Sequence, residues 1–178
     1  PVRAAAISAL AETYKLNEKK IYEAGWDAMS YEVNSEALLA MSIFNRDESL
    51  ALARKTLANS LRNEMYLACW QVLAKNGTAQ DLNILTESVL NSGSQWRNYG
   101  LVFIGRYGVY HPAQLSNNAI DKLVEIYSQN PSLKQHCKYV LFYMKTTWTE
   151  QLESTEDKAL KKELESRLSF LEKQTSSL

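Results

Sequence analysis

Helical apolar patterns recur along this chain at a spacing of roughly 30 to 40 residues, which is the period of many α-helical repeat proteins. In each segment the apolar residues return every three or four positions, so they share one face of a helix. A single helical hairpin cannot bury such a face alone and has to stack on its neighbours, which predicts an all-α, right-handed α-α superhelix of about four to five hairpins. The segments are VRAAAISALAETY from Val2, YEVNSEALLAMSIF from Tyr31, EMYLACWQVLAKNG from Glu64, WRNYGLVFIGRYG from Trp96 and QHCKYVLFYMKTTW from Gln135.

The composition limits the classes of partner. With 178 residues, of which 46% are hydrophobic, the chain can bury a large core as one domain or one continuous array. Lysine plus arginine and aspartate plus glutamate each number 20. The net charge is therefore zero, and no overall positive charge attracts phosphates or anionic lipid. We expect neither a nucleic-acid nor a membrane partner. The longest apolar runs are far shorter than the roughly 20 residues of a membrane-spanning helix.

The start of the chain indicates a fragment. Pro1 precedes a segment that is already helical in pattern, and proline is favoured in the first turn of a helix. No initiating methionine and no signal-type apolar stretch is present. We therefore expect further sequence upstream, where any targeting signal would lie, and the compartment is not readable from this chain.

Several residues mark the expected ends of helices. Ser30 is a candidate cap for the helix from Tyr31, and Asp47 is expected to open its partner helix. Gly77 is expected to end a helix in the left-handed conformation. The range 108–116 is expected to be the longest connection, followed by a helix over 117–129.

Two glycines fall inside the predicted helix that begins near Ser94. Gly100 and Gly105 each cost that helix about 1 kcal/mol relative to alanine. They indicate either a close approach to a neighbouring helix or an end of the helix between Gly105 and Gly108. We favour the close approach.

The last 30 residues contain a higher share of charged side chains than the rest of the chain. We assign residues 1–148 to the helical repeats and residues 149–178 to a capping helix with a short tail in the same domain. The helix is expected from Glu150 to Lys173, with a polar outer face that closes the end of the repeats. A coiled-coil partner helix is the alternative. One face of the predicted helix carries Leu160, Leu164, Leu168 and Leu171.

No motif in the chain carries recognisable catalytic or metal chemistry. The only two histidines, His111 and His136, lie in no metal-binding pair such as H-E-x-x-H. Cys69 and Cys137 fall on apolar faces of different helices, which indicates buried thiols in preference to a disulfide. Neither a phosphate-binding glycine loop nor a G-x-S-x-G turn occurs. We therefore expect no catalytic, cofactor-binding or metal-binding residue in this chain.

One group of residues is a candidate interaction surface, which we name the aromatic–basic cluster. Aromatic side chains and arginine are enriched at protein interfaces. Packing between repeats, with the polar tips at the surface, is the alternative explanation. The cluster consists of Trp96, Arg97, Tyr99, Arg106, Tyr107, Tyr110 and His111.

The segment SYEVNSEALLAMSIFNRDESLALARKTL, from Ser30 to Leu57, resembles a repeat in the C-terminal HEAT-like helical domain of aminopeptidase N-like zinc metallopeptidases. There, Asp/Ser-Tyr-x-Val leads to an Ala-Leu-x-Ala helix and then to an Asp-x-x-x-Ala-Leu-x-Leu-Ala helix. The opening VRAAAISALAETY is similar to the preceding repeat of that family. The second half of the chain matches only as helical hairpins.

This resemblance implies a HEAT/armadillo-like solenoid that acts as a noncatalytic domain. In the family, such a domain packs on the catalytic domain of the same chain, shapes the substrate-access cavity and contacts the distal end of the peptide. The zinc and its ligands belong to the catalytic domain, so no ligand is transferred to this sequence. The alternative is a free-standing HEAT-type scaffold that binds a protein or peptide segment. A helical array like the HEAT-like DNA glycosylases is disfavoured by the zero net charge.

Overall fold

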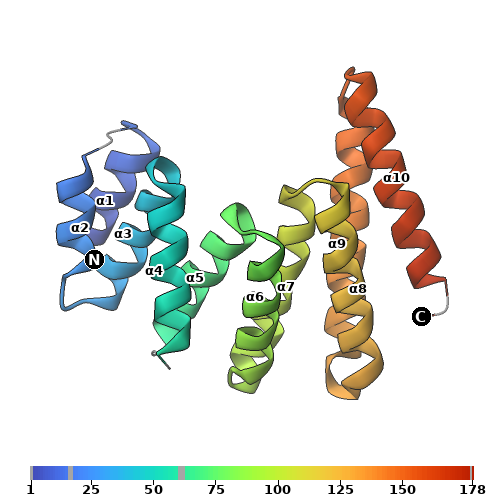
Figure 1. Ribbon diagram of the computed structural model, residues 1–178, viewed down its shortest axis with the longest axis horizontal. Helices are drawn as coiled ribbons and strands as arrows, with labels where there is room; N and C mark the ends of the chain where they lie inside the picture. Colours follow the sequence, from blue (N-terminus) through green and yellow to red (C-terminus); the bar gives the residue numbers. More distant parts are fainter. Residues whose placement is uncertain (1, 16–17, 60–62, 177) are drawn as a thin grey trace. The chain divides into compact units, whose positions relative to one another are not determined.

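The computed structural model describes residues 2–15, 18–59, 63–176 and 178 (Figure 1). These residues form ten α-helices and one short 3-10 helix, with no strand among them, so the predicted all-α class is confirmed. No helix in this part of the chain is long and apolar enough to cross a membrane. Pro1, the predicted first-turn residue, lies outside the described residues. The chain divides into two compact units, Pro1–Thr78 (unit 1) and Ala79–Leu178 (unit 2).

Unit 1 is built around one central helix. The five helices are α1 (Val2–Glu12), α2 (Lys19–Trp26), α3 (Tyr31–Phe44), α4 (Arg46–Ala58) and α5 (Asn63–Asn76). Helix α3 contacts all four of the others. The apolar residues of the segment from Tyr31 were expected to share one face, and the buried residues of α3 are Val33, Ala37, Leu38, Ala40 and Met41.

Helix α2 was not predicted from the sequence, and it packs very close to α1 and α3. A Cβ atom on Gly25 would lie 2.8 Å from Ile7 Cδ1 and 3.0 Å from Ala37 Cβ. The ring of Tyr22 stacks on that of Phe44, with 5.8 Å between the ring centres. A helix of eight residues is too short to be stable alone, so its stability comes from these contacts.

Asn34 forms hydrogen bonds with the segment that connects α2 to α3. Its side-chain amide donates hydrogen bonds to the backbone oxygens of Trp26 and Ala28, the latter at 3.0 Å. These carbonyl groups lie at and beyond the end of α2, where no helical donor is left for them. The asparagine therefore supplies the donors that the end of α2 lacks.

Two predicted helix boundaries in unit 1 are corrected by the structure. Helix α4 begins at Arg46 and is capped by Asn45, whose Oδ1 accepts from Glu48 N at 3.3 Å, so Asp47 does not open it. Gly77 is not left-handed, since no described glycine has a positive φ. Its N–H instead donates to the oxygen of Leu73 at 2.9 Å, which continues the helical hydrogen-bond pattern. Ser30 does precede α3, but its side chain makes no capping hydrogen bond.

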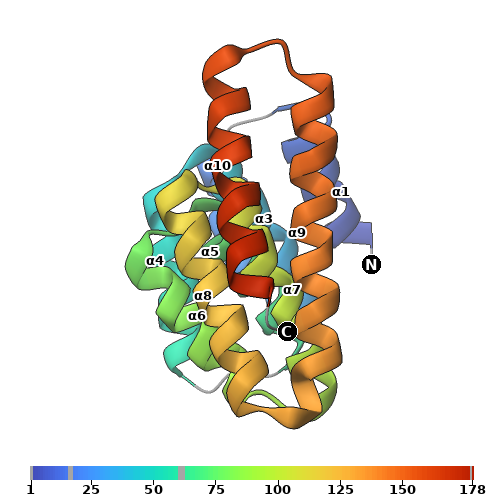
Figure 2. The same ribbon diagram turned by 90° about the vertical axis from the view of Figure 1, so that its right-hand side faces the viewer.

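Unit 2 consists of longer helices. They are α6 (Ala79–Asn91), α7 (Ser94–Tyr110), α8 (Ala113–Gln129), the 3-10 helix η1 (Pro131–Leu133), α9 (Lys134–Ser154) and α10 (Lys158–Thr175). Helix α7 contacts α6, α8 and α9, and α10 contacts α8 and α9. Figure 2 shows α9 and α10 running in opposite directions.

The expected long connection over 108–116 is wrong. Only His111 and Pro112 separate α7 from α8, which begins at Ala113, four residues before the predicted start at Asn117. Pro112 occupies the N-cap position with a φ of −58°, an angle that its ring already imposes. Ser116 Oγ donates to the oxygen of His111 at 2.9 Å and closes this tight turn.

The predicted close approach is confirmed at Gly105, and Gly108, which was not predicted to make one, shares it. Helix α7 continues through Gly105 and Gly108 to Tyr110, so neither glycine ends it. A Cβ atom on Gly105 would overlap Cγ1 of Val140, and one on Gly108 would lie 2.5 Å from Met144 Cε. The two glycines let the backbone of α7 lie against α9.

The terminal helix begins later than the sequence predicted. Residues 150–154 still belong to α9, and α10 starts at Lys158, after Asp157, whose Oδ1 accepts from Ala159 N at 2.8 Å. Leu164 and Leu171 are buried, whereas Leu160 is 37% exposed. Only part of the predicted leucine face of α10 therefore packs against α8 and α9.

A carboxylate of α10 fixes the start of α8. Glu163 Oε1 accepts from Ala113 N at 3.0 Å and from Arg167 Nη2 at 2.5 Å. The hydrogen bond from Arg167 lowers the pKa of Glu163. The Arg167 guanidinium lies 5.8 Å from the centre of the Trp148 ring of α9. The Glu163–Arg167 ion pair lies within α10, and its two members contact α8 and α9 respectively.

Shortening a core leucine is expected to destabilise either unit. Leu38 is fully buried and Leu141 is 4% exposed, so Leu38→Ala and Leu141→Ala should each lower the free energy of unfolding by about 2 to 5 kcal/mol. Leu160→Ala is the matched control, because the same change at an exposed leucine leaves no cavity. Urea unfolding followed by circular dichroism measures all three, and equal midpoints would show that the burial pattern is wrong.

Gly105→Ala is expected to destabilise unit 2 by about 1 to 3 kcal/mol through overpacking, although alanine is the better helix former. The new methyl group would meet the stiff side chain of Val140. In a Val140→Ala background the same change should be neutral or stabilising, because the methyl group then has space. A double-mutant cycle on thermal unfolding measures this coupling, and additive effects would contradict the close contact.

The two cysteines are expected to be inert in the native chain. Cys69 and Cys137 are free and buried, as predicted. Burial raises the pKa of the Cys69 thiol to about 12 and that of Cys137 to about 11, so both stay protonated at pH 8 and little reactive thiolate forms. Ellman's reagent should detect almost no thiol in the native chain and two thiols in denaturant. A rapid native reaction would show that one of them is accessible.

Candidate functional site

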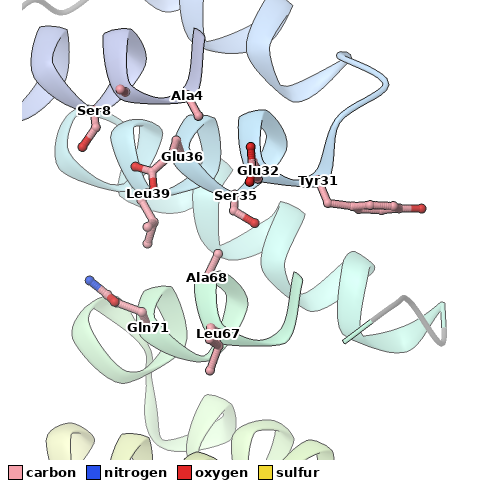
Figure 3. Close-up of a pocket in the computed structure, with 11 residues that line it drawn as sticks. Ala4, Ser8, Tyr31, Glu32, Ser35, Glu36, Leu39, Leu67, Ala68 and Gln71 are labelled. Atoms are coloured by element: carbon pink, nitrogen blue, oxygen red, sulfur yellow. The ribbon is translucent and has the colours of Figure 1, made fainter. Parts of the chain in front are cut away.

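An open groove of about 610 Å³ crosses three helices of unit 1 (Figure 3). Its wall is contributed mainly by α3, with smaller parts from α1 and α5. The lining residues are Ala4, Ala5 and Ser8 from α1, Tyr31, Glu32, Ser35, Glu36 and Leu39 from α3, and Leu67, Ala68 and Gln71 from α5. Tyr31 lies at one end of this set, and Ser8, Leu39 and Gln71 lie towards the other (Figure 3).

The groove wall and the core are formed by opposite faces of α3. Successive residues of an α-helix are rotated by about 100°. On that basis Glu32, Glu36 and Leu39 lie within about 60° of one another. The buried residues Ala37 and Met41 lie about 100° to 180° from each of them. The same periodicity that buries one side of α3 therefore presents the other side to the groove.

Small side chains keep the groove open. Alanine or serine occupies the lining positions of α1, and Ser35 and Ala68 lie on the facing parts of α3 and α5. In Figure 3, Ala68 points from α5 towards α3. Ser35 Oγ lies 3.4 Å from Met65 Sδ, a weak hydrogen bond that joins these two helices. Larger residues at these positions would fill the space.

The lining is acidic. Glu32 is exposed and Glu36 is half-buried, and the two carboxylates are one helical turn apart on α3. None of the residues named above as lining the groove is a lysine, an arginine or a histidine. Ser8, Tyr31 and Gln71 add neutral groups that can donate or accept hydrogen bonds. The described lining thus combines two carboxylates with several neutral polar groups.

Unit 2 carries a second, smaller groove between α9 and α10, with a volume of about 260 Å³. It is lined by Leu141, Phe142 and Leu171, together with Lys138 and Lys145. Lys145 pairs with Glu172 at 2.9 Å, so its charge is partly neutralised. The adjoining surface of α9 exposes two large aromatic side chains, since Tyr139 is 65% and Phe142 is 67% exposed.

The aromatic–basic cluster does not form one continuous surface. Tyr107 is fully buried and His111 is 8% exposed, whereas Tyr99 and Tyr110 are 66% and 53% exposed. The structure brings together only the buried members, with 4.2 Å between the ring centres of Tyr107 and His111. Burial, and secondarily the charge of Asp81, raises the pKa of Tyr107 to about 12. This part of the cluster packs inside unit 2.

The remaining members of the cluster lie at the edge of α7. Trp96, Arg97 and Arg106 are half-buried. Arg97 donates from Nη2 to the oxygen of Ser92 at 3.0 Å and so ties α7 to the end of α6. The guanidinium of Arg106 lies 5.2 Å from the centre of the Phe103 ring on the same helix. These contacts orient the arginines within unit 2.

The described residues contain no group of three or more histidine, cysteine, aspartate or glutamate side chains that could hold a metal ion. His136 is exposed on α9, whereas its neighbour Cys137 is buried. The two side chains therefore point in different directions, as expected for adjacent residues on a helix.

The two glutamates of the groove were not predicted from the sequence. Glu32 and Glu36 are spaced by four residues on the polar side of α3, which is also the pattern of an ordinary solvated helix face. The useful signal was the absence of bulky residues at the facing positions Ala4, Ser8 and Ala68. That signal appears only once α1 and α5 are known to lie beside α3.

The chain matches no protein-family model, no curated protein and no solved structure.

Proposed function

We propose that this chain is a noncatalytic helical-repeat domain of a zinc-dependent aminopeptidase, in which it forms the C-terminal domain. Its partner is then the catalytic domain of the same parent chain, which holds the zinc ion. The domain packs on that partner and shapes the cavity through which the peptide substrate enters. The groove of unit 1 is the part of the domain that contacts a polypeptide.

The observation that carries this proposal is the position of the segment that resembles the aminopeptidase repeat. Ser30–Leu57 forms one hairpin, with α3 and α4 in contact. Helix α3 supplies five of the lining residues of the groove, more than α1 or α5. The similar segment therefore supplies the largest share of the lining of this groove, which supports a role in shaping a peptide cavity.

We further propose that each unit is a stretch of a right-handed HEAT-like solenoid. In unit 1, α3 contacts α4 and α5, and in unit 2, α7 contacts α8 and α9 while α8 contacts α9 and α10. Each of these helices packs on the next helix and on the one after it. Stacked helical hairpins produce this pattern, because each hairpin has to cover the apolar face of its neighbour.

A free-standing scaffold that binds a protein segment is the second candidate. The exposed aromatic residues Tyr139 and Phe142 on α9 favour it, because such side chains anchor protein interfaces. A scaffold of this kind needs no catalytic domain in the same chain.

The reading frame upstream of Pro1 distinguishes the two candidates. For the aminopeptidase domain we expect an H-E-x-x-H motif with a downstream glutamate ligand in that frame. Metal analysis should then find about one zinc ion per parent chain and none in residues 1–178 alone. A complete reading frame without the motif would reject the aminopeptidase and leave the scaffold. Zinc bound by residues 1–178, and lost in His111→Ala or His136→Ala, would contradict both candidates.

A further inference from the structure

We propose that one internal water molecule binds between α8, α9 and α10 of unit 2. It accepts hydrogen bonds from the Trp148 indole and the Arg167 guanidinium and donates one to the side chain of Asn117. The site lies within unit 2 and does not depend on the proposed aminopeptidase or on the groove of unit 1.

Three buried polar atoms form the proposed site. Trp148 Nε1, Arg167 Nε and Asn117 Oδ1 have no hydrogen-bond partner among the described residues. Trp148 is fully buried and Arg167 is 6% exposed, and Asn117 is half-buried with its Oδ1 covered. A buried donor or acceptor that stays unpaired loses the hydrogen bonds it made to solvent in the unfolded chain, so native proteins pair such atoms with protein or with ordered water.

Contacts between α8 and α10 fix the register of these two helices. Near their beginnings Glu163 Oε1 accepts from Ala113 N at 3.0 Å, and near their ends the backbone oxygen of Leu178 accepts from Tyr127 Oη at 3.1 Å. These pairs join residues 50 and 51 positions apart, so the helices run in the same direction with a constant offset. The offset places Asn117, one turn after Ala113, level with the residue one turn after Glu163.

That residue of α10 is Arg167, and Trp148 of α9 lies at the same level. The Arg167 guanidinium is 5.8 Å from the centre of the Trp148 ring. Helices α9 and α10 run in opposite directions (Figure 2), and Lys145 pairs with Glu172 at 2.9 Å, roughly one turn from both residues. Two contacts along α9 therefore agree on the register, and the three unpaired atoms come from one level of α8, α9 and α10.

The pattern of donors and acceptors selects water over an ion. The indole and the guanidinium Nε each offer one N–H, and the amide oxygen of Asn117 offers an acceptor. A water molecule satisfies all three, and about three hydrogen bonds are typical of a buried water. The positive charge of Arg167 disfavours a cation. The Asn117 oxygen and the Glu163 carboxylate, which already pairs with Arg167, disfavour an anion.

The test is NMR of the ¹⁵N-labelled chain, which detects transfer of magnetisation from water to the indole N–H of Trp148. A long-lived internal water should give a nuclear Overhauser cross-peak to this proton, whereas surface water exchanges too fast to give one. Trp148→Phe identifies the indole signal by removing it. The cross-peak should be the same in sodium chloride and in sodium fluoride, because the bound molecule is not chloride.

A variant of the acceptor assigns the cross-peak to this site. Asn117→Leu should abolish it, because the substitution removes the acceptor and puts methyl groups where the water lies. Asn118→Leu is the matched control, because it makes the same change at the neighbouring exposed residue of α8, and it should keep the cross-peak. Neither substitution removes a hydroxyl group, so a signal relayed from a protein hydroxyl would survive in both. Unfolding curves check that each variant retains the fold.

A high-resolution crystal structure of the parent chain is the second measurement, and it does not depend on the folding of a variant. It should show one water within about 3.2 Å of Trp148 Nε1, Arg167 Nε and Asn117 Oδ1. The proposal is overturned if the parent chain gives no cross-peak or if the cross-peak survives in Asn117→Leu. A chloride ion at this position, or direct hydrogen bonds among the three side chains, would also overturn it.

Discussion

Unit 1 depends on the burial of one face of α3. This helix contacts every other helix of the unit, and its buried residues form the surface on which α1, α2, α4 and α5 assemble. Because α1 and α5 both pack on α3, this helix sets their positions and the distance across the groove. Gly25 and Asn34 contribute to the same packing. The glycine allows α2 to lie close to α3, and the asparagine donates a hydrogen bond to a backbone oxygen just beyond the end of α2. The candidate site is therefore a consequence of the core.

Unit 2 adds a close backbone contact and an ion pair to its apolar core. The fully buried side chains of Leu101, Ile104 and Leu123 belong to that core. Helix α7 approaches α9 at Gly105 and Gly108, where a Cβ atom would meet Val140 or Met144. Glu163, which pairs with Arg167, joins α10 to the first residue of α8.

Apolar spacing predicted the helical class and the buried cysteines, and glycine predicted the close contact of α7 at Gly105. Both signals are visible in one sequence. Helix α2 was missed because it lies between the recurring apolar segments that were used to predict helices. The short turn at Pro112 was mistaken for a long loop because proline suits both. The groove was not predicted because it exists only where Glu32 and Glu36 of α3 lie beside small residues of α1 and α5. The sequence does not show that these three helices are neighbours.

The division of α3 into two faces has a consequence for how this domain can change. Residues that hold the fold, such as Val33 and Ala37, are distinct from Glu32 and Glu36, which set the charge of the groove. Substitutions of these polar side chains can therefore change the surface of the groove at little thermodynamic cost to the scaffold. An arginine in place of Glu36 would reverse the charge at that position while the buried face of α3 stays the same. The stability of unit 1 and the chemistry of its groove are thus set by different residues of a single helix.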